Sequence, residues 1–259
     1  MEAREYDIMY RTEKDHWWFK GKRKIVFTQI SKFLDEDKKY SILDVGCGTG
    51  IIVKEFSKLG DAMGLDIEIK ALKFCQNRGL KKLVQGDLMH LPFEDNSYDI
   101  VSIFDVLYHK DVKDDVAAMR ELFRIIKPGG LLVLTDSADM KLWSRHDVAA
   151  HARERYSVPK MSSRLEKAGF EIKKVSYFNT LLYPAIFAYR KLDNFLNKDK
   201  PAKTNIDKTN PIINSILYSL LWTESRILKL GRLPFGVSIF VIGKKPAKIR
   251  PGRIRKTRN

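Results

Sequence analysis

A glycine-rich turn joins a short apolar segment to a helical one near the start of the chain. Residues 40–45 have the composition of a buried strand, residues 51–59 have a helical spacing of apolar side chains, and the sequence between them is Gly46-Cys47-Gly48-Thr49-Gly50. Glycines let the backbone turn tightly and let a ligand come close to it. A strand that passes through such a turn into a helix predicts an α/β fold with a ligand near the turn.

Strand and helix patterns continue to alternate beyond the turn. Strands that alternate with helices predict a mostly parallel sheet with helices on both faces. The sequence therefore predicts a doubly wound, seven-stranded α/β fold. We expect its strands at 40–45, 61–66, 82–86, 98–104, 131–135, 170–178 and 237–243, and its helices at 21–34, 51–59, 68–77, 112–126 and 159–168.

The remaining residues extend this core. Two apolar, helical runs at 181–196 and 212–230 predict an insertion between the sixth and seventh strands, with a polar linker at 197–210 between them. The polar stretch 137–158 predicts a loop. We expect five segments: a lid and helix segment (1–39), the ligand-binding core (40–180), a helical insertion (181–235), the last core strand (236–243) and a disordered basic tail (244–259).

The net charge of +16 is concentrated at the C-terminal end of the chain. Residues 244–259 hold eight Lys or Arg and no acid, which accounts for half of that charge. Such a tail suits nucleic acid, an anionic membrane surface or an acidic substrate, and it equally suits a solubilising end. Two cysteines, and no apolar stretch typical of a signal peptide or a spanning helix, lead us to expect a cytoplasmic protein.

Three acidic residues follow successive strands beside the glycine turn. Asp44 lies two residues before Gly46, Asp66 ends the second predicted strand, and Asp87 follows the third. A carboxylate beside the turn repels pyrophosphate and attracts an ammonium group, whereas Asp66 suits the ribose of any nucleoside ligand, NAD included. Each acid alone is also typical of a loop or a cap. Together, at the sheet edge where ligands bind, they predict a nucleoside site.

Several motifs, in order, resemble the small-molecule type of class I methyltransferases that use S-adenosylmethionine. They are LDVGCGTG, GLDI, QGDLMHLPFEDNSYDIV and VLYHKDVKDDVAAMRELFRIIKPGGLLVLT, within residues 41–136. The resemblance implies a Rossmann-like methyltransferase fold of the type 11 kind and S-adenosylmethionine as the cofactor. Other motifs (HWWFKGKR, WSRHD, YFNTLLYP and LPFGVSIF) resemble a microbial subgroup that is linked to glycan or lipid-glycan assembly.

The resemblance also implies roles for particular residues. The glycine turn and Asp44 would hold the methionine part of the cofactor, Asp66 its ribose, and Asp87 its adenine. Phe104 and Asp105 would lie along the cofactor toward the acceptor. The implied cofactor-binding residues are Asp44, Gly46, Cys47, Gly48, Gly50, Asp66, Ile67, Asp87, Leu88 and Phe104.

Two departures from the resemblance concern the acceptor. Relatives commonly have an acid before the histidine at Tyr108-His109, which leaves the acceptor chemistry open. The chain lacks the (Asp/Asn)-Pro-Pro-aromatic motif of many nucleobase methyltransferases, and this absence disfavours methylation of a DNA or RNA base.

The candidate catalytic residues are His109, Asp136 and His146. Methyl transfer is an in-line displacement, so a base is needed only where the acceptor must lose a proton, as a hydroxyl must. His109 follows the fourth strand and is the preferred base, with a capping or packing role as the alternative. Asp136 suits a substrate hydroxyl or a loop start. His146 and His151 are five residues apart, which does not place both on one helix face, so we predict no metal site.

Aromatic residues and the insertion indicate how the acceptor is held. Trp17, Trp18, Trp143 and Tyr156 are candidates to close over it, because aromatic faces pack on sugars and lipids. Trp17 and Trp18 could instead serve only to dock the N-terminal segment on the core. The insertion carries basic residues beside apolar stripes, which suits peripheral membrane contact or a helical hairpin packed on the sheet.

The predicted function is a methyltransferase that transfers a methyl group from S-adenosylmethionine to an oxygen of a small molecule, sugar or lipid-linked glycan. Nitrogen is the less favoured acceptor atom. An RNA-directed methyltransferase is an alternative that only the basic charge favours. A non-catalytic binding module of the same fold and a NAD enzyme are further alternatives. The intact turn with its three acids disfavours the former.

Overall fold

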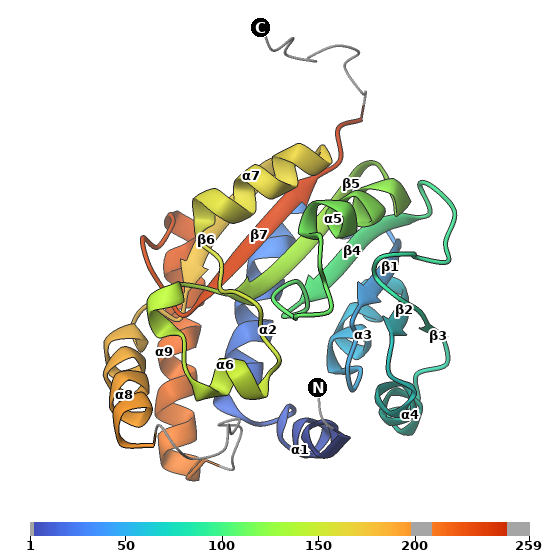
Figure 1. Ribbon diagram of the computed structural model, residues 1–259. Coiled ribbons are helices and arrows are strands. Elements are labelled where there is room, and N and C mark those ends of the chain that lie inside the picture. Colours follow the sequence, from blue (N-terminus) through green and yellow to red (C-terminus); the bar gives the residue numbers. More distant parts are fainter. Residues whose placement is uncertain (1–2, 198–208, 248–259) are drawn as a thin grey trace, which may run out of the picture.

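A computed structural model describes residues 3–197 and 209–247. Its centre is one seven-stranded sheet with the strand order β3-β2-β1-β4-β5-β7-β6 (Figure 1). Only β7 runs antiparallel to its neighbours, β5 and β6. The predicted doubly wound, mostly parallel sheet is therefore confirmed. The strands are β1 (Tyr40–Val45), β2 (Gly60–Asp66), β3 (Leu83–Gln85), β4 (Tyr98–Phe104), β5 (Ile126–Ser137), β6 (Glu171–Phe178) and β7 (Ser238–Lys244).

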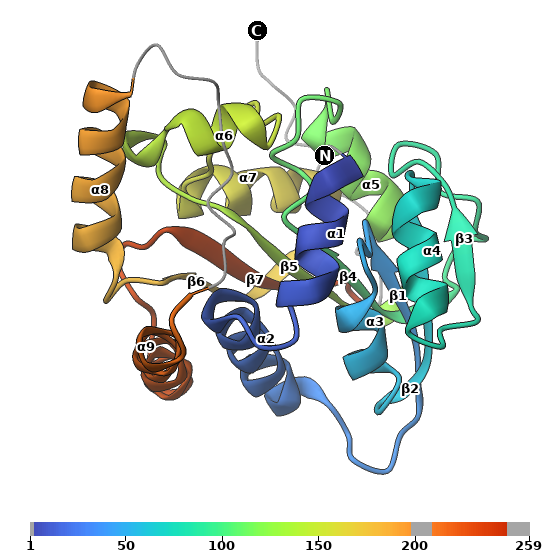
Figure 2. The ribbon, with the colours of Figure 1, turned by 90° about the horizontal axis from the view of Figure 1, so that it is seen from below.

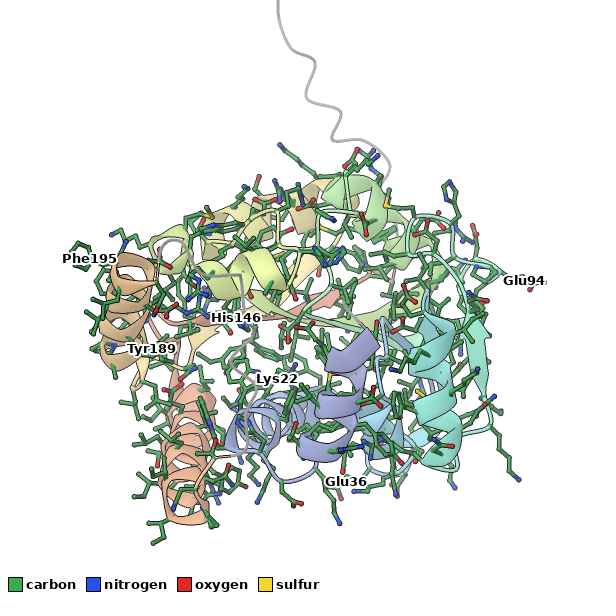
Figure 3. All side chains as sticks on the ribbon, turned by 60° about the horizontal axis from the view of Figure 1, so that its bottom comes forward. Lys22, Glu36, Glu94, His146, Tyr189 and Phe195 are labelled. Carbon is green, nitrogen blue, oxygen red and sulfur yellow. The ribbon has the colours of Figure 1, made fainter. Side chains whose placement is uncertain are left out.

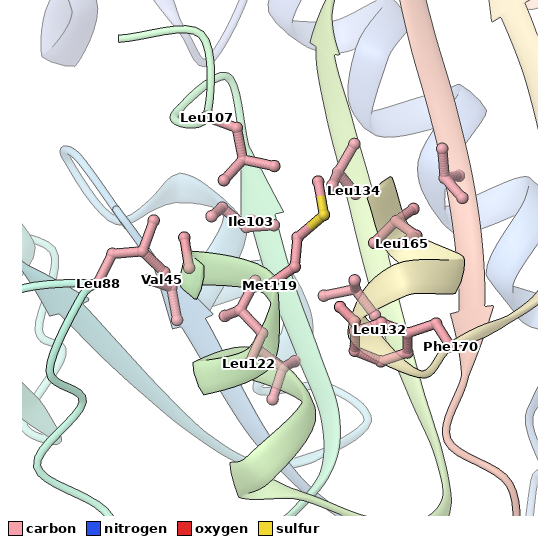
Figure 4. Close-up of a cluster of buried hydrophobic side chains, with 14 of the residues drawn as sticks. Val45, Leu88, Ile103, Leu107, Met119, Leu122, Leu132, Leu134, Leu165 and Phe170 are labelled. Carbon is pink, nitrogen blue, oxygen red and sulfur yellow. The ribbon is translucent and has the colours of Figure 1, made fainter. Parts of the chain in front are cut away.

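Helices cover both faces of this sheet. Successive side chains of a strand point to opposite faces, so Ile42 joins one apolar cluster and Leu43 the other. On one face, α5 (Asp115–Ile125) and α7 (Val158–Ala168) pack on the sheet through side chains such as Met119 and Leu165 (Figure 4). The other face carries α2 (Trp17–Ile30), α3 (Ile51–Phe56) and α9 (Pro211–Leu230).

Two further helices lie toward the edge where the strands end. In Figure 2, α1 (Ala3–Thr12) lies beside α4 (Ile69–Asn77). Tyr10 of α1 packs on Phe74 of α4 with ring centroids 4.8 Å apart, and Asp7 pairs with Lys70 at 2.6 Å. The N-terminal segment is therefore held across the ligand-binding edge of the sheet.

The ends of α5 differ from the prediction. Asp114 caps the helix by accepting hydrogen bonds from the backbone N–H groups of Val116 and Ala117 at 2.9 and 3.0 Å, so the helix begins at Asp115 instead of residue 112. It ends at Ile125, and β5 then starts five residues earlier than the apolar pattern predicts.

The helices between β6 and β7 occupy two different places. α9 packs along α2 (Figure 2). The Glu224 side chain of α9 also accepts hydrogen bonds from the backbone N–H groups of Asn179 and Leu181, just after β6, at 2.6 and 2.7 Å. α8 (Tyr183–Leu196) stands beside α6 (Arg145–Ala149). Within the described residues, no helix is both long and apolar enough to cross a bilayer.

The stretch 137–158 is more ordered than the predicted loop. It holds a 3₁₀ turn (Met140–Leu142) and α6, and it buries Arg155 and Tyr156. The prediction was wrong here because polar composition hides a network of buried hydrogen bonds: Arg155 donates to the carbonyls of Ala138 and Val237 and pairs with Asp147.

The start of the predicted tail also belongs to the fold. Lys244 ends β7, and buried Lys245 donates hydrogen bonds to Asn96 Oδ1 at 2.9 Å and to the carbonyl of Phe123 at 2.8 Å. The rest of the tail from residue 248, and most of the linker (198–208), lie outside the described residues.

Candidate functional site

A pocket of about 650 Å³ opens at the carboxyl ends of β1, β2 and β4. Its walls come from these strand ends, from α1 and α2, and from the α6 and α8 region. Its volume lies in the range of small-molecule sites, and its place is the one where open α/β sheets bind ligands. A smaller hollow of about 320 Å³ is lined by residues such as Lys38 and Gly60 at the start of β2, away from the glycine turn.

The glycine turn forms one wall through its backbone. Gly46, Gly48 and Gly50 have φ angles of 71°, 54° and 85°, which favour glycine. A Cβ on Gly46 would lie 2.4 Å from a methyl group of Val106. Gly46, Cys47 and Gly48 line the pocket, as predicted for cofactor-binding residues.

Gly50 has a different place. It is not among the lining residues, and a Cβ there would lie 2.7 Å from Leu80 and 2.8 Å from the sulfur of Cys75. Gly50 is the residue that precedes α3, so its role in the structure is to let the turn enter that helix. A cofactor contact by Gly50 stays a prediction.

Asp44 lies at the base of the pocket, 3% exposed. Among the described residues, only the Ser102 hydroxyl donates a hydrogen bond to its side chain, at 2.6 Å to Oδ1. Burial raises the pKa of Asp44 to about 7, and the Ser102 hydrogen bond and the nearby Lys22 charge act in the opposite direction. A cationic ligand group would therefore meet a buried carboxylate whose Oδ2 accepts no hydrogen bond from a described residue.

Asp66 and Asp87 line the same pocket. Buried Asp66 accepts hydrogen bonds from the N–H groups of Gly48 at 2.8 Å and Glu68 at 3.0 Å, while burial raises its pKa. Asp87 is exposed and accepts from the N–H of Met89 at 2.9 Å. The structure thus brings all three predicted acids to one pocket.

The remaining predicted cofactor residues also line the pocket. Ile67 is 59% exposed, whereas Leu88 and Phe104 are buried. The two apolar side chains at positions 67 and 88 follow β2 and β3, beside Asp87. They provide apolar surface next to a carboxylate, which is the combination that an adenine ring with its amino group requires.

Lys22 was missed by the sequence reasoning. It lines the pocket from α2, and its Nζ lies 2.5 Å from Oδ2 of Asp105, with the Lys22 side chain 9% exposed. Asp105 has a φ of 56°, an uncommon conformation for a residue other than glycine. No local pattern distinguishes Lys22 from the lysines at positions 20 and 24; only the packing of α2 across the strand ends selects it.

His109 lines the pocket after β4. Its Nδ1 accepts a hydrogen bond from the N–H of Asp111 at 3.4 Å and lies 3.3 Å from Oδ2 of Asp111, while its Nε2 is buried with no hydrogen-bond partner among the described residues. Burial lowers the pKa of His109 below its ordinary value, so the ring is neutral near pH 7. A neutral imidazole ring is able to accept a proton at its unprotonated nitrogen.

The other two catalytic candidates have different surroundings. His146 lines the pocket, and burial together with the Arg190 charge lowers its pKa to about 4. Asp136 is fully buried and is not among the lining residues. It accepts hydrogen bonds from the N–H groups of Tyr108 and Ser137, at 3.2 and 2.7 Å. The structure therefore gives Asp136 a place in shaping the loop after β4, because its buried carboxyl accepts the hydrogen bond from Tyr108 in that loop.

The four aromatic candidates separate into two groups. Trp17 and Trp18 line the pocket. Trp18 also stacks on Phe178, with ring centroids 5.8 Å apart, so it both attaches the N-terminal segment to the core and forms part of the pocket wall. Trp143 and Tyr156 do not line it. Tyr156 is fully buried, and its hydroxyl lies within hydrogen-bond distance of the Leu107 carbonyl (3.0 Å) and the Asp115 carboxylate (2.6 Å).

Helix α1 and Glu13 just after it, which belong to the predicted lid segment, form one side of the pocket. Tyr6, Met9 and Glu13 line the pocket, although no motif marked them in the sequence. Glu13 accepts a hydrogen bond from the Thr49 hydroxyl in the glycine turn and pairs with Arg78. These contacts connect the lid directly to the turn.

Comparisons with known proteins agree with this geometry. Residues 43–134 match the family model of a methyltransferase domain. The chain is 30% identical over 150 residues to a sterol 24-C-methyltransferase of Schizosaccharomyces pombe, covering 52% of this chain and 39% of that protein. It is 34% identical over 122 residues to a demethylmenaquinone methyltransferase of Staphylococcus aureus, covering 44% and 50%. The chain thus spans half or less of the length of these curated relatives.

Solved structures share the fold. An S-adenosylmethionine-dependent methyltransferase from Mesorhizobium loti superposes with a TM-score of 0.56 at 17% identity, covering 85% of this chain and 98% of that one. One from Methanosarcina mazei gives a TM-score of 0.56 at 18% identity, with the same coverage of 85% and 98%.

Residues 43–134 therefore match a methyltransferase domain, and the seven-stranded fold is shared with solved S-adenosylmethionine-dependent methyltransferases.

Proposed function

We propose that this protein transfers a methyl group from S-adenosylmethionine, bound in the 650 Å³ pocket, to a small-molecule acceptor. The observation that carries the proposal is that three carboxylates and a bare-backbone turn line one pocket. Asp44 would face the ammonium of the methionine part, Asp66 the ribose and Asp87 the adenine. Oδ2 of Asp44 has no hydrogen-bond donor among the described residues, which fits a cationic ligand group.

When bound, S-adenosylmethionine supplies a methyl group on a positively charged sulfur. The protein's part is to align the acceptor with that methyl group and to exclude water. Phe104 lines the pocket with Nζ of Lys22 from α2 5.9 Å from its ring centre, and residues of α1 line the same pocket. The lid and the aromatic residues Trp17 and Trp18 serve this exclusion.

The favoured acceptor atom is an oxygen. As a hydroxyl oxygen attacks the methyl group, its proton would pass to the neutral ring of His109. A nitrogen acceptor that is already deprotonated has less need of this base, and it remains the second choice.

The acceptor itself would be a small molecule with an apolar part, such as a lipid or a lipid-linked glycan. The two curated relatives are named for sterol and demethylmenaquinone methylation, and both of those acceptors are lipids. In this chain, α8 and α9 expose large apolar side chains, among them Phe195 at 82% and Leu230 at 92%. These side chains, with the basic charge, support peripheral contact with an anionic membrane.

An RNA acceptor has less support. Its only argument is the basic charge, and half of that charge belongs to the tail from residue 244. The pocket walls near Trp17 and Ile186 are apolar and partly covered by α1 and α8, which suits a small acceptor better than an RNA strand.

The test is methyl transfer from S-adenosylmethionine with a labelled methyl group to lipid, glycan and RNA fractions of the source cell. We expect label in the lipid or glycan fraction with the wild-type protein, and none with Asp66→Ala. Label confined to RNA would replace the proposed acceptor class. No transfer to any fraction, together with no binding of S-adenosylmethionine in calorimetry, would contradict the proposal.

A further inference from the structure

The part of the pocket lined by α6 and α8 is called its acceptor end here. It holds two guanidinium groups that face one carboxylate. Arg155 pairs with Asp147 at 2.6 Å and Arg190 pairs with the same carboxylate at 3.2 Å. All three side chains are buried, with exposed fractions of 2% for Arg155, 13% for Arg190 and 3% for Asp147. One carboxylate balances one of these charges, so the group carries one net positive charge.

Two nearby carboxylates have other partners: Asp139 accepts a hydrogen bond from the Tyr183 hydroxyl, and Asp193 pairs with Arg145 at 3.3 Å. The Lys22 and Asp105 pair is balanced in itself. His146, on α6 beside this group, is neutral near pH 7 because burial and Arg190 lower its pKa to about 4.

The two arginines differ in how many of their donors are occupied. Arg155 uses Nε, Nη1 and Nη2 for bonds to the Ala138 carbonyl, Asp147 and the Val237 carbonyl. Arg190 uses only Nη1, which donates to the Leu142 carbonyl at 2.8 Å and to Asp147. Its Nε and Nη2 make no hydrogen bond to a described residue. Because Arg190 lines the pocket, these donors are available to a ligand.

Apolar side chains lie beside this charge. Ile186 and Tyr189 line the pocket from α8, one turn and one residue before Arg190, and Trp17 and Trp18 line it from α2. Figure 3 shows Tyr189, His146 and Lys22 around the same space, on α8, α6 and α2. The acceptor end of the pocket therefore combines an apolar wall with an unsatisfied guanidinium.

We propose that the acceptor carries an anionic group, a carboxylate or a phosphate, that binds Arg190 while its apolar part lies along Ile186, Trp17 and Trp18. This inference rests on the proposed methyl transfer for one point only, which is that the bound ligand is the molecule that receives the methyl group. Guanidinium groups form paired hydrogen bonds to both kinds of anion, so the shared chemistry is an oxyanion next to an apolar chain.

A purely structural role for Arg190 is the competing explanation, because its bond to the Leu142 carbonyl also fastens α8. Two variants separate the roles. Asn194→Ala removes another hydrogen bond that holds α8 in place, from Asn194 Nδ2 to the Trp143 carbonyl at 2.9 Å. It leaves the charge of the two arginines and Asp147 unchanged. Asp147→Asn keeps the shape of the side chain but removes the shared negative charge.

The experiment is calorimetric titration of the full chain with hexyl phosphate, hexanoate and hexanol. We expect at least one of the anions to bind the wild-type protein more tightly than hexanol, and the tighter of the two identifies the acceptor's anionic group. Arg190→Gln should weaken that binding at least about tenfold, which corresponds to about 1.4 kcal/mol. Asn194→Ala should leave it unchanged, and Asp147→Asn should strengthen it.

Two results would overturn the inference: hexanol binding as tightly as both anions, or weaker anion binding in Asp147→Asn and Asn194→Ala as well as in Arg190→Gln. If Arg190→Gln does not fold, the opposite signs expected for Asp147→Asn and Arg190→Lys, stronger and weaker, decide the question. Titration with S-adenosylmethionine is a separate readout. Its failure in the wild-type protein would contradict the methyltransferase proposal and leave the anion result as it stands.

Discussion

Asp44 is the proposed partner of a cationic ligand group, and because it is buried we expect ligand binding to depend on pH. Its pKa in the free protein is raised to about 7 by burial. A bound ammonium group favours the ionised form, so the protein must release this proton on binding when the pH is below about 7. Affinity for S-adenosylmethionine should therefore fall by up to about tenfold for each pH unit below 7, and it should fall again above about 8, where the ligand's own ammonium group loses its proton. Calorimetry across this range measures it.

Two variants test the origin of this pH dependence. Asp44→Asn should bind the cofactor more weakly and lose the pH dependence. Lys22→Met should move the midpoint upward, because the Lys22 charge lowers the pKa of Asp44. A pH profile that is identical in the wild type and in Asp44→Asn would remove this residue from the account.

His109 is the second residue with a specific expectation. As the proposed base, its loss in His109→Ala should lower kcat by about 10²–10⁴ for a hydroxyl acceptor and leave affinity for S-adenosylmethionine unchanged. Its pKa is lowered by burial, so the wild-type rate should stay constant down to below about 6.5, the ordinary value for histidine, and then fall as the ring is protonated. His90→Ala is the control, since His90 is exposed and does not line the pocket. Unchanged turnover in His109→Ala would contradict the assignment.

At the scale of single elements, the turn from β1 into α3 depends on Gly50. Ala at Gly50 meets both an unfavourable φ and close contacts with Leu80 and Cys75, whereas Gly79 has a similar φ of 82° and no atom within 4 Å of a new Cβ. Gly79→Ala should lower the free energy of unfolding by about 1–2 kcal/mol, and Gly50→Ala by a further ~1–3 kcal/mol. Urea denaturation measures both. Equal losses would show that packing at Gly50 contributes nothing.

The lid α1 depends on Arg78 of the α4 region. Arg78 donates to the Thr49 carbonyl at 2.7 Å and to the Tyr10 carbonyl at 3.2 Å, and it pairs with Glu13. Arg78→Ala should therefore loosen the lid, which would speed dissociation of S-adenosylmethionine and expose α1 to protease. Lys82→Ala, which breaks an exposed pair with Asp61, is the control and should change neither rate. Equal dissociation rates in all three proteins would count against a lid.

Element by element, the sequence predicted those parts whose pattern is local. The strands from β1 to β4 and the acids at their ends follow from apolar runs and a glycine turn, and they agree with the structure within one or two residues. Lys22, Arg190 and the lid residues Tyr6 and Met9 had no such pattern. Their place in the pocket follows from how α1, α2 and α8 pack, which depends on contacts between residues far apart in the chain. The order in 137–158 was missed for the same reason, since Arg155 is satisfied by distant carbonyls.

At the scale of the whole molecule, the exposed apolar side chains of α8 and α9 and the net charge of +16 predict binding to anionic membranes. The protein should sediment with vesicles that contain phosphatidylglycerol and less so with neutral vesicles or at high salt, because the attraction is screened. Phe195→Glu should weaken this binding. Ser163→Glu, the same change of charge at an exposed position of α7, should weaken it less. Equal effects would mean that charge alone acts and that the apolar surface does not insert.

The central claim is that the carboxylates after β1, β2 and β3 and the glycine turn hold S-adenosylmethionine. A crystal structure of the protein with S-adenosylhomocysteine tests it most directly. The account predicts the ribose hydroxyls on Asp66, the amino group against Asp44 and the adenine beside Leu88, under α1. A pocket that stays empty at saturating ligand, or a ligand bound away from Asp44 and Asp66, would contradict it.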